Sequence, residues 1–491
     1  MSLAKKVAIN TLIQISGKIV ATILGLFSLA IITRYLGRAG FGEYTTVITY
    51  LTFFAVIADL GLTLVTVQMI SGEEKDENKI LNNLFGLRLI SAVLILSLAP
   101  LLMALFPYNQ AIKSGILIAL ISFLFPALNQ IIIGLFQKKL SMDRDAIAEI
   151  ASRLVLILSL LLAIDLESGL NGILLANVAS AATSFFFHYI LSRPFAALRP
   201  EFDWALWKKI ISKSWPLAIT IVLNLIYLRA DTLLLSLFKT TDDVGLYGAS
   251  YRIIDVLTTI PFMFAGLILP IMTAAWLGKN PDYFKKVLQK SFDLMLIMAI
   301  PLIIGAQCTA SAILTFVAGP EFTSAGYILQ ILIFAVAAIF IGTMFSHAVI
   351  ALDRQKSMIS LYVFTSLSSL IAYLILIPRF SYFGAASVTV YSETMIAIFS
   401  GYCVYKYSGF RPNFRMLGKS LVSSLIMGAA LYFLLMPYQT TLVGLIMILI
   451  IGIIIYLLAL FLMGGIKYAD LLAIFKGQNK SGGPTYNSPD F

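Results

Sequence analysis

The sequence predicts an all-α polytopic membrane protein: about fourteen transmembrane helices, forming two six-helix lobes in a parallel pseudo-twofold repeat plus two C-terminal helices. Of its 491 residues, 60% are hydrophobic and only 12% are charged, whereas a soluble domain carries about 25% charged residues. Apolar runs long enough to cross a bilayer as a helix, roughly 18 residues or more, recur along the whole chain. The third observation is an internal repeat, described below.

Fourteen apolar segments are the candidate spans. They cover residues 9–33, 44–70, 80–106, 114–137, 145–164, 169–192, 215–238, 245–276, 287–317, 323–351, 357–377, 382–405, 416–436 and 440–463. With the N-terminus in the cytoplasm, inside segments hold 25 of the 35 Lys and Arg residues and outside loops hold 5, as the positive-inside rule requires. We therefore expect a multi-pass protein of the cell (plasma or inner) membrane with both termini cytoplasmic. The net charge of +11 then needs no nucleic acid to explain it.

Composition along the chain suggests five parts. They are an N-terminal lobe with helices 1–6 (1–200), an amphipathic linker (201–214), a C-terminal lobe with helices 7–12 (215–410), helices 13–14 (411–465) and a cytoplasmic tail (466–491). In the linker, Trp204, Trp207, Ile210 and Ile211 share one face of a helix, as expected for a segment that lies on the membrane surface.

The two lobes are related by a weak repeat in the sequence. Residues 41–44 (FGEY) align with 244–247 (VGLY) at an offset of 203. Gly172 aligns with Gly384 at an offset of 212, and the pair 143–144 (DR) aligns with 353–354 (DR) at an offset of 210. A six-helix unit used twice keeps its orientation, so the axis relating the lobes runs along the membrane normal. Two such lobes around a cavity are typical of a transporter, and a duplicated scaffold without transport is the alternative.

Charged residues inside the predicted spans are the candidate site. The cations are Lys18, Arg88, Arg153, Arg229 and Arg252, and the anions are Asp59, Glu149, Asp231, Asp255, Asp293 and Glu393. A cation at mid-helix costs about 2.5–3.5 kcal/mol on insertion scales, so each should face a partner, water or substrate. Sequence spacing allows Arg252 to pair with Asp255 and Arg153 with Glu149. Lys18, Arg88 and Arg229 have no local partner, and unpaired cations suit an anion such as phosphate.

Polar side chains on the same spans could line the same space. They include Asn83, Asn129, Gln130, Asn224, Tyr227 and Tyr251. They suit a hydroxyl-rich ligand, but ordinary hydrogen bonding between helices explains them equally well. No cofactor motif is present, and the longest segment between spans, about 22 residues, is too short for a catalytic domain such as that of a membrane glycosyltransferase. We therefore expect a transporter and not an enzyme.

Four stretches carry a family resemblance. Residues 34–44 (RYLGRAGFGEY), 58–62 (ADLGL), 229–238 (RADTLLLSLF) and 244–253 (VGLYGASYRI) resemble the Wzx-type oligosaccharide flippases. This is the polysaccharide-biosynthesis branch of the multidrug/oligosaccharidyl-lipid/polysaccharide exporter superfamily, and the resemblance covers nearly the whole chain. It implies alternating-access translocation of a polyisoprenyl-diphosphate-linked oligosaccharide from the cytoplasmic to the outer leaflet. An ion-coupled multidrug antiporter and a lipid II flippase are the alternatives within the superfamily.

The resemblance also suggests roles for particular residues. The expected substrate-binding residues are Lys18, Arg88, Arg229, Arg252, Asn129, Asn224 and Tyr227. The residues expected to couple transport to Na+ or H+, or to form structural pairs, are Asp59, Asp231, Asp255 and Glu393. The expected partners are the lipid-linked oligosaccharide, the bilayer and a glycan polymerase or glycosyltransferases, and the chain is expected to act as a monomer.

Overall fold

The computed structural model describes residues 3–70, 77–435 and 441–465, and the predicted cytoplasmic tail lies outside them. The first group of helices comprises α1 (Leu3–Asp59), α2 (Leu62–Ile70), α3 (Glu77–Leu102), η1 (Met103–Leu105), α4 (Gln110–Lys139), α5 (Met142–Asp165) and α6 (Gly169–Ser192). The second comprises α7 (Trp204–Phe238), α8 (Thr241–Leu277), α9 (Pro281–Ala318), η2 (Pro320–Phe322), α10 (Ala325–Ala351), η3 (Gln355–Met358) and α11 (Ile359–Ser408). The last elements are α12 (Arg415–Ala430), η4 (Leu431–Leu435) and α13 (Leu442–Leu462).

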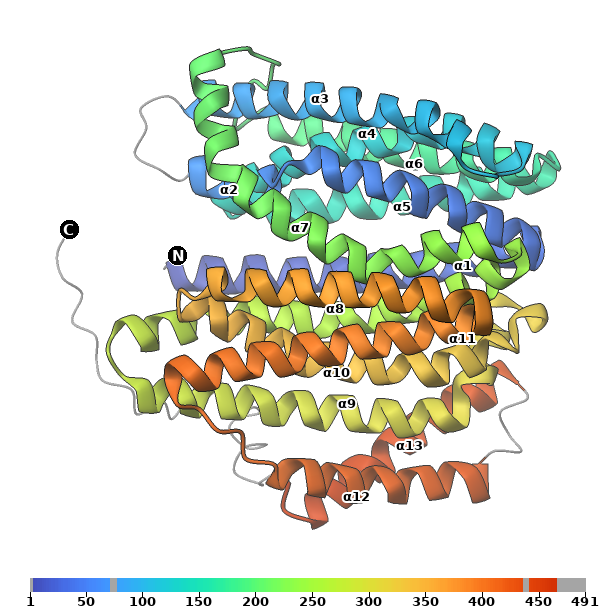
Figure 1. Cartoon of the computed structure of the whole chain (residues 1–491), viewed down its shortest axis with the longest axis vertical. Helices are drawn as coiled ribbons and strands as arrows, with labels where there is room; N and C mark the ends of the chain where they lie inside the picture. The colour runs from blue at the N-terminus through green and yellow to red at the C-terminus, as the bar shows by residue number, and fades with distance from the viewer. Residues whose placement is uncertain (1–2, 71–76, 436–440, 466–491) are drawn as a thin grey trace.

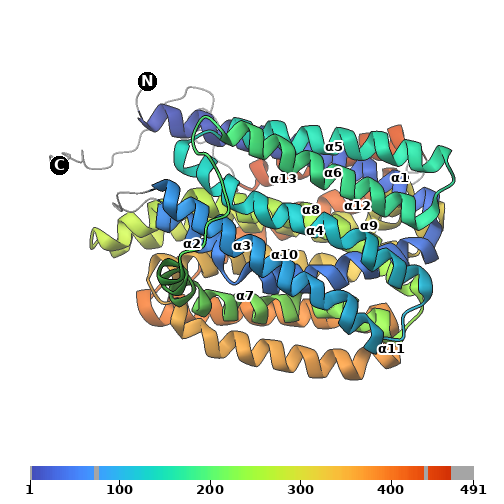
Figure 2. The ribbon, with the colours of Figure 1, turned by 90° about the horizontal axis from the view of Figure 1, so that it is seen from above.

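The helices run side by side in two layers of the molecule, with α2–α6 on one side, α8–α11 on the other and α12 and α13 beyond them (Figures 1 and 2). Eleven helices of the described residues are long and apolar enough to span a membrane, and the bent pair in α7 makes a twelfth. Two of the eleven, in α1 and α11, each contain a break with non-helical backbone, at Gly37 and Ser381. Dividing these two gives fourteen, which confirms the predicted fold class.

The turn predicted at residues 34–43 is much shorter than expected. Gly37 alone leaves the helical conformation (φ 64°, ψ −173°), so α1 reverses around a single residue. A positive φ strains any residue with a Cβ, which explains glycine here. We call this end of the molecule the Gly37 end and the other the opposite end.

The second predicted span is also interrupted. Leu60 and Gly61 both have positive φ, and they separate α1 from α2 within the stretch 58–62. A continuous helix over 44–70 is therefore a wrong prediction. A break in a membrane helix leaves backbone carbonyls that need hydrogen-bond donors from outside the helix.

The predicted linker and the seventh span both lie in α7, which extends from Trp204 to Phe238 and bends by 49° between Tyr227 and Arg229. Trp207 and Ile210 are buried, whereas Trp204 is exposed, so only part of the predicted apolar face packs on the protein. Asp203 caps the helix by accepting backbone hydrogen bonds, and its hydrogen bond with Lys79 holds the pKa of its carboxyl below the usual range.

The repeat at an offset of 203 forms a symmetric contact between the lobes. A Cβ added at Gly42 would overlap the carbonyl oxygen of Thr241, and one at Gly245 would overlap the carbonyl oxygen of Arg38. Adding 203 to 38 and 42 gives 241 and 245, so each contact is the symmetry mate of the other. Small residues allow helix backbones to approach this closely. The two copies of the repeated stretch therefore pack against each other on the pseudo-twofold axis.

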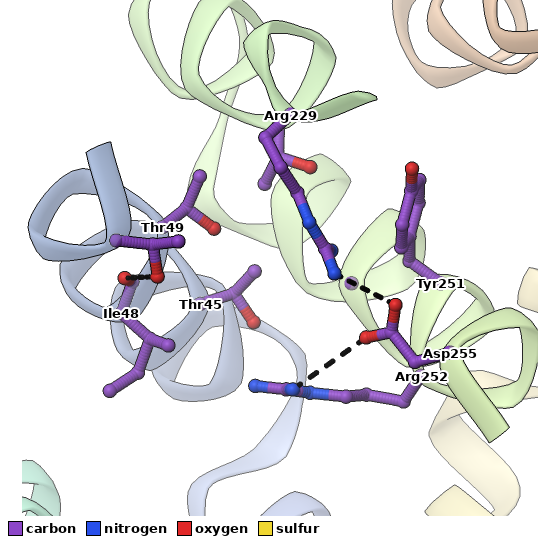
Figure 3. Close-up of a pocket in the computed structure, with 10 residues that line it drawn as sticks. Thr45, Ile48, Thr49, Arg229, Tyr251, Arg252 and Asp255 are labelled. Carbon is purple, nitrogen blue, oxygen red and sulfur yellow. Dashed lines mark hydrogen bonds and ion pairs between the residues drawn. The ribbon is translucent and has the colours of Figure 1, made fainter. Parts of the chain in front are cut away.

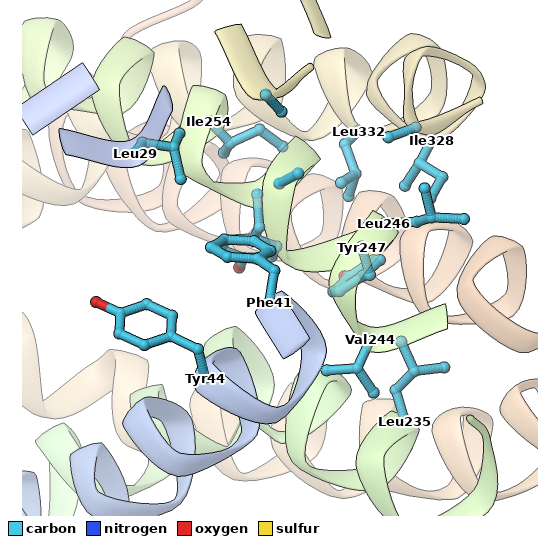
Figure 4. Packing of buried hydrophobic residues seen from close by; sticks show 14 of the residues in the cluster. Leu29, Phe41, Tyr44, Leu235, Val244, Leu246, Tyr247, Ile254, Ile328 and Leu332 are labelled. Carbon is cyan, nitrogen blue, oxygen red and sulfur yellow. The ribbon is translucent and has the colours of Figure 1, made fainter. Parts of the chain in front are cut away.

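Hydrophobic packing joins the lobes at the Gly37 end. One buried cluster there contains residues of both lobes, including Phe41 of α1 with Val244 and Tyr247 of α8 (Figure 4). Phe41 also packs edge to face on Phe322, with ring centroids 5.8 Å apart. Toward the opposite end the buried residues separate into one cluster around α2, α3, α4 and the start of α7, and another around α8–α11. The lobes are therefore joined at the Gly37 end.

Candidate functional site

A cavity of about 750 Å³ occupies the interior of the first lobe and reaches the second. Helices α1, α4, α5 and α6 form most of its wall, and α8 contributes the remainder. Its polar lining residues are Lys18, Thr22, Ser28, Tyr44, Ser122, Asn129, Gln130, Asp145, Glu149, Ser152, Arg153, Asn177, Ser180, Ser184, His188, Arg252, Asp255 and Thr259. Hydroxyl and amide groups thus dominate, with a few charges among them.

One face of α6 organises this wall. Its lining residues recur at helical spacing and are Asn177, Ser180, Ser184 and His188. The Ser180 hydroxyl donates to the carbonyl of Ser152 on α5 at 2.9 Å, and Asn129 Nδ2 on α4 donates to Ser184 Oγ at 3.1 Å. These two contacts lie four residues apart along α6, which is about 6 Å. Asn129 and Ser152 therefore flank the cavity within roughly one helical turn of each other.

A carboxylate and an imidazole meet at the edge of the same wall. His188 Nε2 lies 3.0 Å from Asp145 Oδ1, and its Nδ1 lies 2.8 Å from the carbonyl oxygen of Ser184. A protonated imidazole can donate to both of these acceptors. The negative charge of Asp145 therefore has a partner.

A smaller pocket of about 90 Å³ lies between the lobes, where α1 faces α7 and α8 (Figure 3). Arg229 Nη2 contacts Asp255 Oδ1 at 2.8 Å, and Arg252 Nη1 lies 3.8 Å from Asp255 Oδ2. The Arg229 guanidinium also lies over the Tyr251 ring, 4.8 Å from its centroid. One carboxylate thus serves two guanidinium groups, which leaves an excess of one positive charge.

Hydroxyl groups of α1 face this cluster. Thr45, Thr49 and Thr52 line the pocket with Arg229 and Arg252, and Arg252 and Asp255 also line the large cavity. The two spaces therefore share a charged wall.

The ion-pair partners of Lys18 and Arg153 differ from those that the sequence spacing suggested. Lys18 Nζ contacts Glu149 Oε1 at 3.0 Å, so the local pair between Arg153 and Glu149 is a wrong prediction. Arg153 lines the cavity and makes no hydrogen bond or ion pair within the described part of the chain. A partner from another helix competed for Glu149 and left the arginine unpaired. Arg153 was not among the expected substrate-binding residues.

Arg88 is not in the wall of either cavity. Its guanidinium is 4% exposed and contacts the Asp59 carboxylate at 2.5 Å. It also donates to the backbone carbonyls of Asp59 and Ala127, both at 2.9 Å. Arg88 therefore supplies one donor that the break after Asp59 requires, and the Ser91 hydroxyl donates to the neighbouring carbonyl of Ala58 at 3.0 Å. The sequence offers Arg88 no local partner, and Asp59 lies 29 residues earlier in the chain. The two form the structural pair that was one of the alternatives for Asp59.

Two further expected residues lie on α7 outside the residues that line these cavities. Tyr227 is buried, and its ring stacks on Tyr362 with centroids 6.4 Å apart. Asn224 lies about one turn earlier in the same helix. Asn129, by contrast, lines the large cavity, and its buried Oδ1 has no hydrogen-bond partner among the described residues.

Asp231 and Glu393 are buried inside the second lobe. Asp231 Oδ2 accepts hydrogen bonds from the hydroxyls of Tyr247 at 2.6 Å and Thr389 at 3.2 Å. Glu393 Oε1 has no hydrogen-bond partner within the described residues. No group of three His, Cys, Asp or Glu residues in the described ranges is placed to hold a metal ion. The two carboxylates line neither cavity, although Asp231 is near enough to Arg229 for their charges to interact.

Two lobes of helices that join at one end and enclose a polar cavity define a class, the two-lobe membrane transporters. Within this class, the chain belongs to the polysaccharide biosynthesis protein family, whose model matches residues 5–276. The match covers the first lobe and the first two helices of the second.

Two curated relatives come from Haloferax volcanii. "Probable low-salt glycan biosynthesis flippase Agl15" is 25% identical over 207 residues, which are 42% of this chain and 44% of that protein. "Probable flippase AglR" is 24% identical over 212 residues, which are 43% and 44% of the two chains. The matched part spans less than half the length of either relative.

Solved structures with the same fold include transporters of two kinds. The lipid II flippase MurJ in an inward closed conformation superposes with a TM-score of 0.75 at 17% identity, covering 94% of this chain and all of that one. A multidrug resistance MATE family transporter in an inward-facing conformation gives 0.62 at 15% identity, covering 81% of this chain and 98% of that one. At these identities the likeness concerns the fold alone.

Proposed function

We propose that this protein is a flippase that moves a polyisoprenyl-diphosphate-linked oligosaccharide from the cytoplasmic to the outer leaflet by alternating access. The main support is the pair of adjoining spaces, one with two arginines that share one carboxylate and one lined by hydroxyl and amide groups. The first suits a diphosphate and the second suits a glycan. The curated relatives are named as flippases and not as enzymes.

In this mechanism Arg229 and Arg252 hold the diphosphate. Their excess positive charge attracts the anion, and the hydroxyls of Thr45 and Thr49 can donate to phosphate oxygens. The glycan occupies the large cavity, and the lipid tail stays in the bilayer. For release, the lobes separate at the Gly37 end and close at the opposite end. The positive-inside asymmetry supports placing both termini in the cytoplasm.

The energy source in this proposal is a gradient of H+ or Na+. Asp231 and Glu393 support it, because two buried carboxylates in the second lobe are not paired with any of the described cations by an ion pair. Buried carboxylates without such a partner favour a proton or an ion. The protein acts as a monomer, and glycosyltransferases or a glycan polymerase supply or consume its substrate.

A lipid II flippase is the second candidate, favoured by the superposition over 94% of the chain. A multidrug antiporter is less well supported. Its cationic substrates need a net negative cavity, whereas the three carboxylates that line the large cavity each have a cationic or imidazole partner.

The test is transport in reconstituted vesicles. A polyisoprenyl-diphosphate-linked oligosaccharide is placed in one leaflet, and its appearance in the other is measured with an enzyme that modifies accessible glycan. The double variant Arg229→Gln/Arg252→Gln should lose at least about tenfold in rate, since both diphosphate contacts are gone. Lys286→Gln, on an exposed part of α9, is the control. Equal rates in the double variant and wild type would contradict the proposal.

A further inference from the structure

We infer that Arg153 determines substrate specificity by binding the carboxylate of an acidic sugar in the translocated glycan. This inference rests on the proposed function and names the class of glycan that the large cavity accepts.

The charges around the cavity single out Arg153. Each lining carboxylate already has a partner: Glu149 contacts Lys18, Asp255 contacts two arginines, and Asp145 contacts His188. Within the described residues Arg153 has none, and its side chain is half-buried. Arg153 is therefore the cation of this wall that an incoming anion can bind without displacing a protein carboxylate.

The depth of Arg153 makes an unpaired charge costly. It lies eleven residues after Met142, where α5 begins, and this is about 16 Å along the helix. A bilayer core is about 30 Å thick, so the backbone of Arg153 lies near the middle of this span. Charged groups at this depth face water-filled cavities or partners. A charge kept there without a protein partner indicates that a ligand supplies one.

The groups around Arg153 are those that bind sugars. Ser152, its neighbour, contacts Ser180, and one turn further along α6 Ser184 contacts Asn129. Asn129 Oδ1 is buried without a hydrogen-bond donor, and no hydrogen bond from the Gln130 amide is formed within the described residues. An acceptor and an amide group that can bind sugar hydroxyls therefore line the same cavity as Arg153, and Asn129 meets α6 about one helical turn from the level of Ser152.

The anion could in principle belong to the diphosphate instead of a sugar. The pocket at Arg229 and Arg252 is better suited to a diphosphate, because it holds two guanidinium groups and several hydroxyls. A single guanidinium among amides and hydroxyls matches the one negative charge and planar shape of a carboxylate. The geometry thus favours an acidic sugar at Arg153.

The experiment compares two substrates on the same polyisoprenyl diphosphate, one with a uronic acid and one with the corresponding neutral hexose. Transport of both is measured in vesicles with wild-type protein, Arg153→Gln and Arg153→Lys. We expect Arg153→Gln to slow the acidic substrate at least tenfold and the neutral one less than twofold, with Arg153→Lys in between. Lys286→Gln should behave as wild type.

An equal loss on both substrates would show that the bound anion is the shared diphosphate and would overturn the inference. Unchanged transport of both would overturn it too. A wild-type protein that moves neither substrate would overturn the proposed function, and this inference with it. A competition experiment with the wild-type protein tests the inference even if the Arg153 variants misfold. We expect a methyl glucuronide to slow transport of the acidic substrate, and a methyl glucoside to have no effect. Equal effects of the two sugars would also count against the inference.

Discussion

The two lobes share one helix plan and use its interior differently. In the first lobe, α5 brings Glu149 and Arg153 to the cavity wall. The offset of 210 residues places Ile359 and Val363 at the corresponding positions of α11. The duplicated helices therefore provide the same architecture twice, whereas substitutions at inward-facing positions decide what each lobe can bind.

One pair of corresponding helices in the two lobes differs in burial. Its helix α10 corresponds to α4 of the first lobe, and 72% of the most apolar stretch of α10 is buried against 44% for α4. Two carboxylates of this lobe, Asp231 and Glu393, lie inside the protein and not on the wall of the large cavity, whereas Asp255 of the same lobe lines it. Corresponding helices of the repeat therefore differ in how deeply they are buried, although they occupy equivalent places in the two lobes.

The largest expected effect tests whether the two arginines inside the first lobe have different roles, with Arg88 stabilising the fold and Arg153 facing the cavity. Arg88→Ala leaves the Asp59 carboxylate without its cationic partner and the Asp59 backbone carbonyl at the helix break without its donor. Removal of one partner from a buried pair costs about 3–5 kcal/mol in the free energy of unfolding. Thermal unfolding of the purified protein in detergent measures this loss. Arg153→Ala, in the same lobe, is the matched control and should unfold near the wild-type temperature. Similar losses in both variants would remove the distinction.

A smaller effect is expected at the contact between the lobes. Gly42→Ala puts a Cβ into the carbonyl oxygen of Thr241, so the backbones must separate, at a cost of about 1–3 kcal/mol. Because closure at the Gly37 end is one state of the proposed transport cycle, we expect the transport rate to fall about tenfold. Gly266→Ala is the control, since its added Cβ would meet no atom within 4 Å. If the two alanine variants transport equally well, close approach at the axis is not needed.

The smallest effect should appear in the second lobe. Asp231→Asn keeps the size of the side chain and can still accept a hydrogen bond from Tyr247. We expect substrate affinity to change less than about twofold, while the acceleration of transport by an imposed H+ or Na+ gradient is lost. Transport with and without each gradient measures this, and Asp293→Asn on α9 is the control. Full gradient dependence in Asp231→Asn would assign a structural role to this carboxylate.

The sequence predicted the architecture well because hydropathy, span length and charge asymmetry are local properties that a bilayer imposes on the chain. It also placed Gly42 opposite Gly245 in the alignment, before any contact between them was known. The partners of charged residues were harder to predict. The spacing of Glu149 and Arg153 permits a pair, but Lys18 on another helix is the partner. The contacts of Arg88 with Asp59 depend on a helix break at Leu60 and Gly61, and the apolar pattern of that span gives no sign of the break.

The contact between Gly42 and Gly245 has a kinetic consequence. Its surfaces are backbone atoms of two rigid helices, with no side chain on either glycine. Side chains that pack on closure lose rotamer entropy each time they are ordered, whereas these surfaces lose none of their own. In the proposed cycle, reassociation at these two glycines therefore docks two preformed backbone surfaces, and only the surrounding side chains, such as Phe41 and Val244, have to be ordered again.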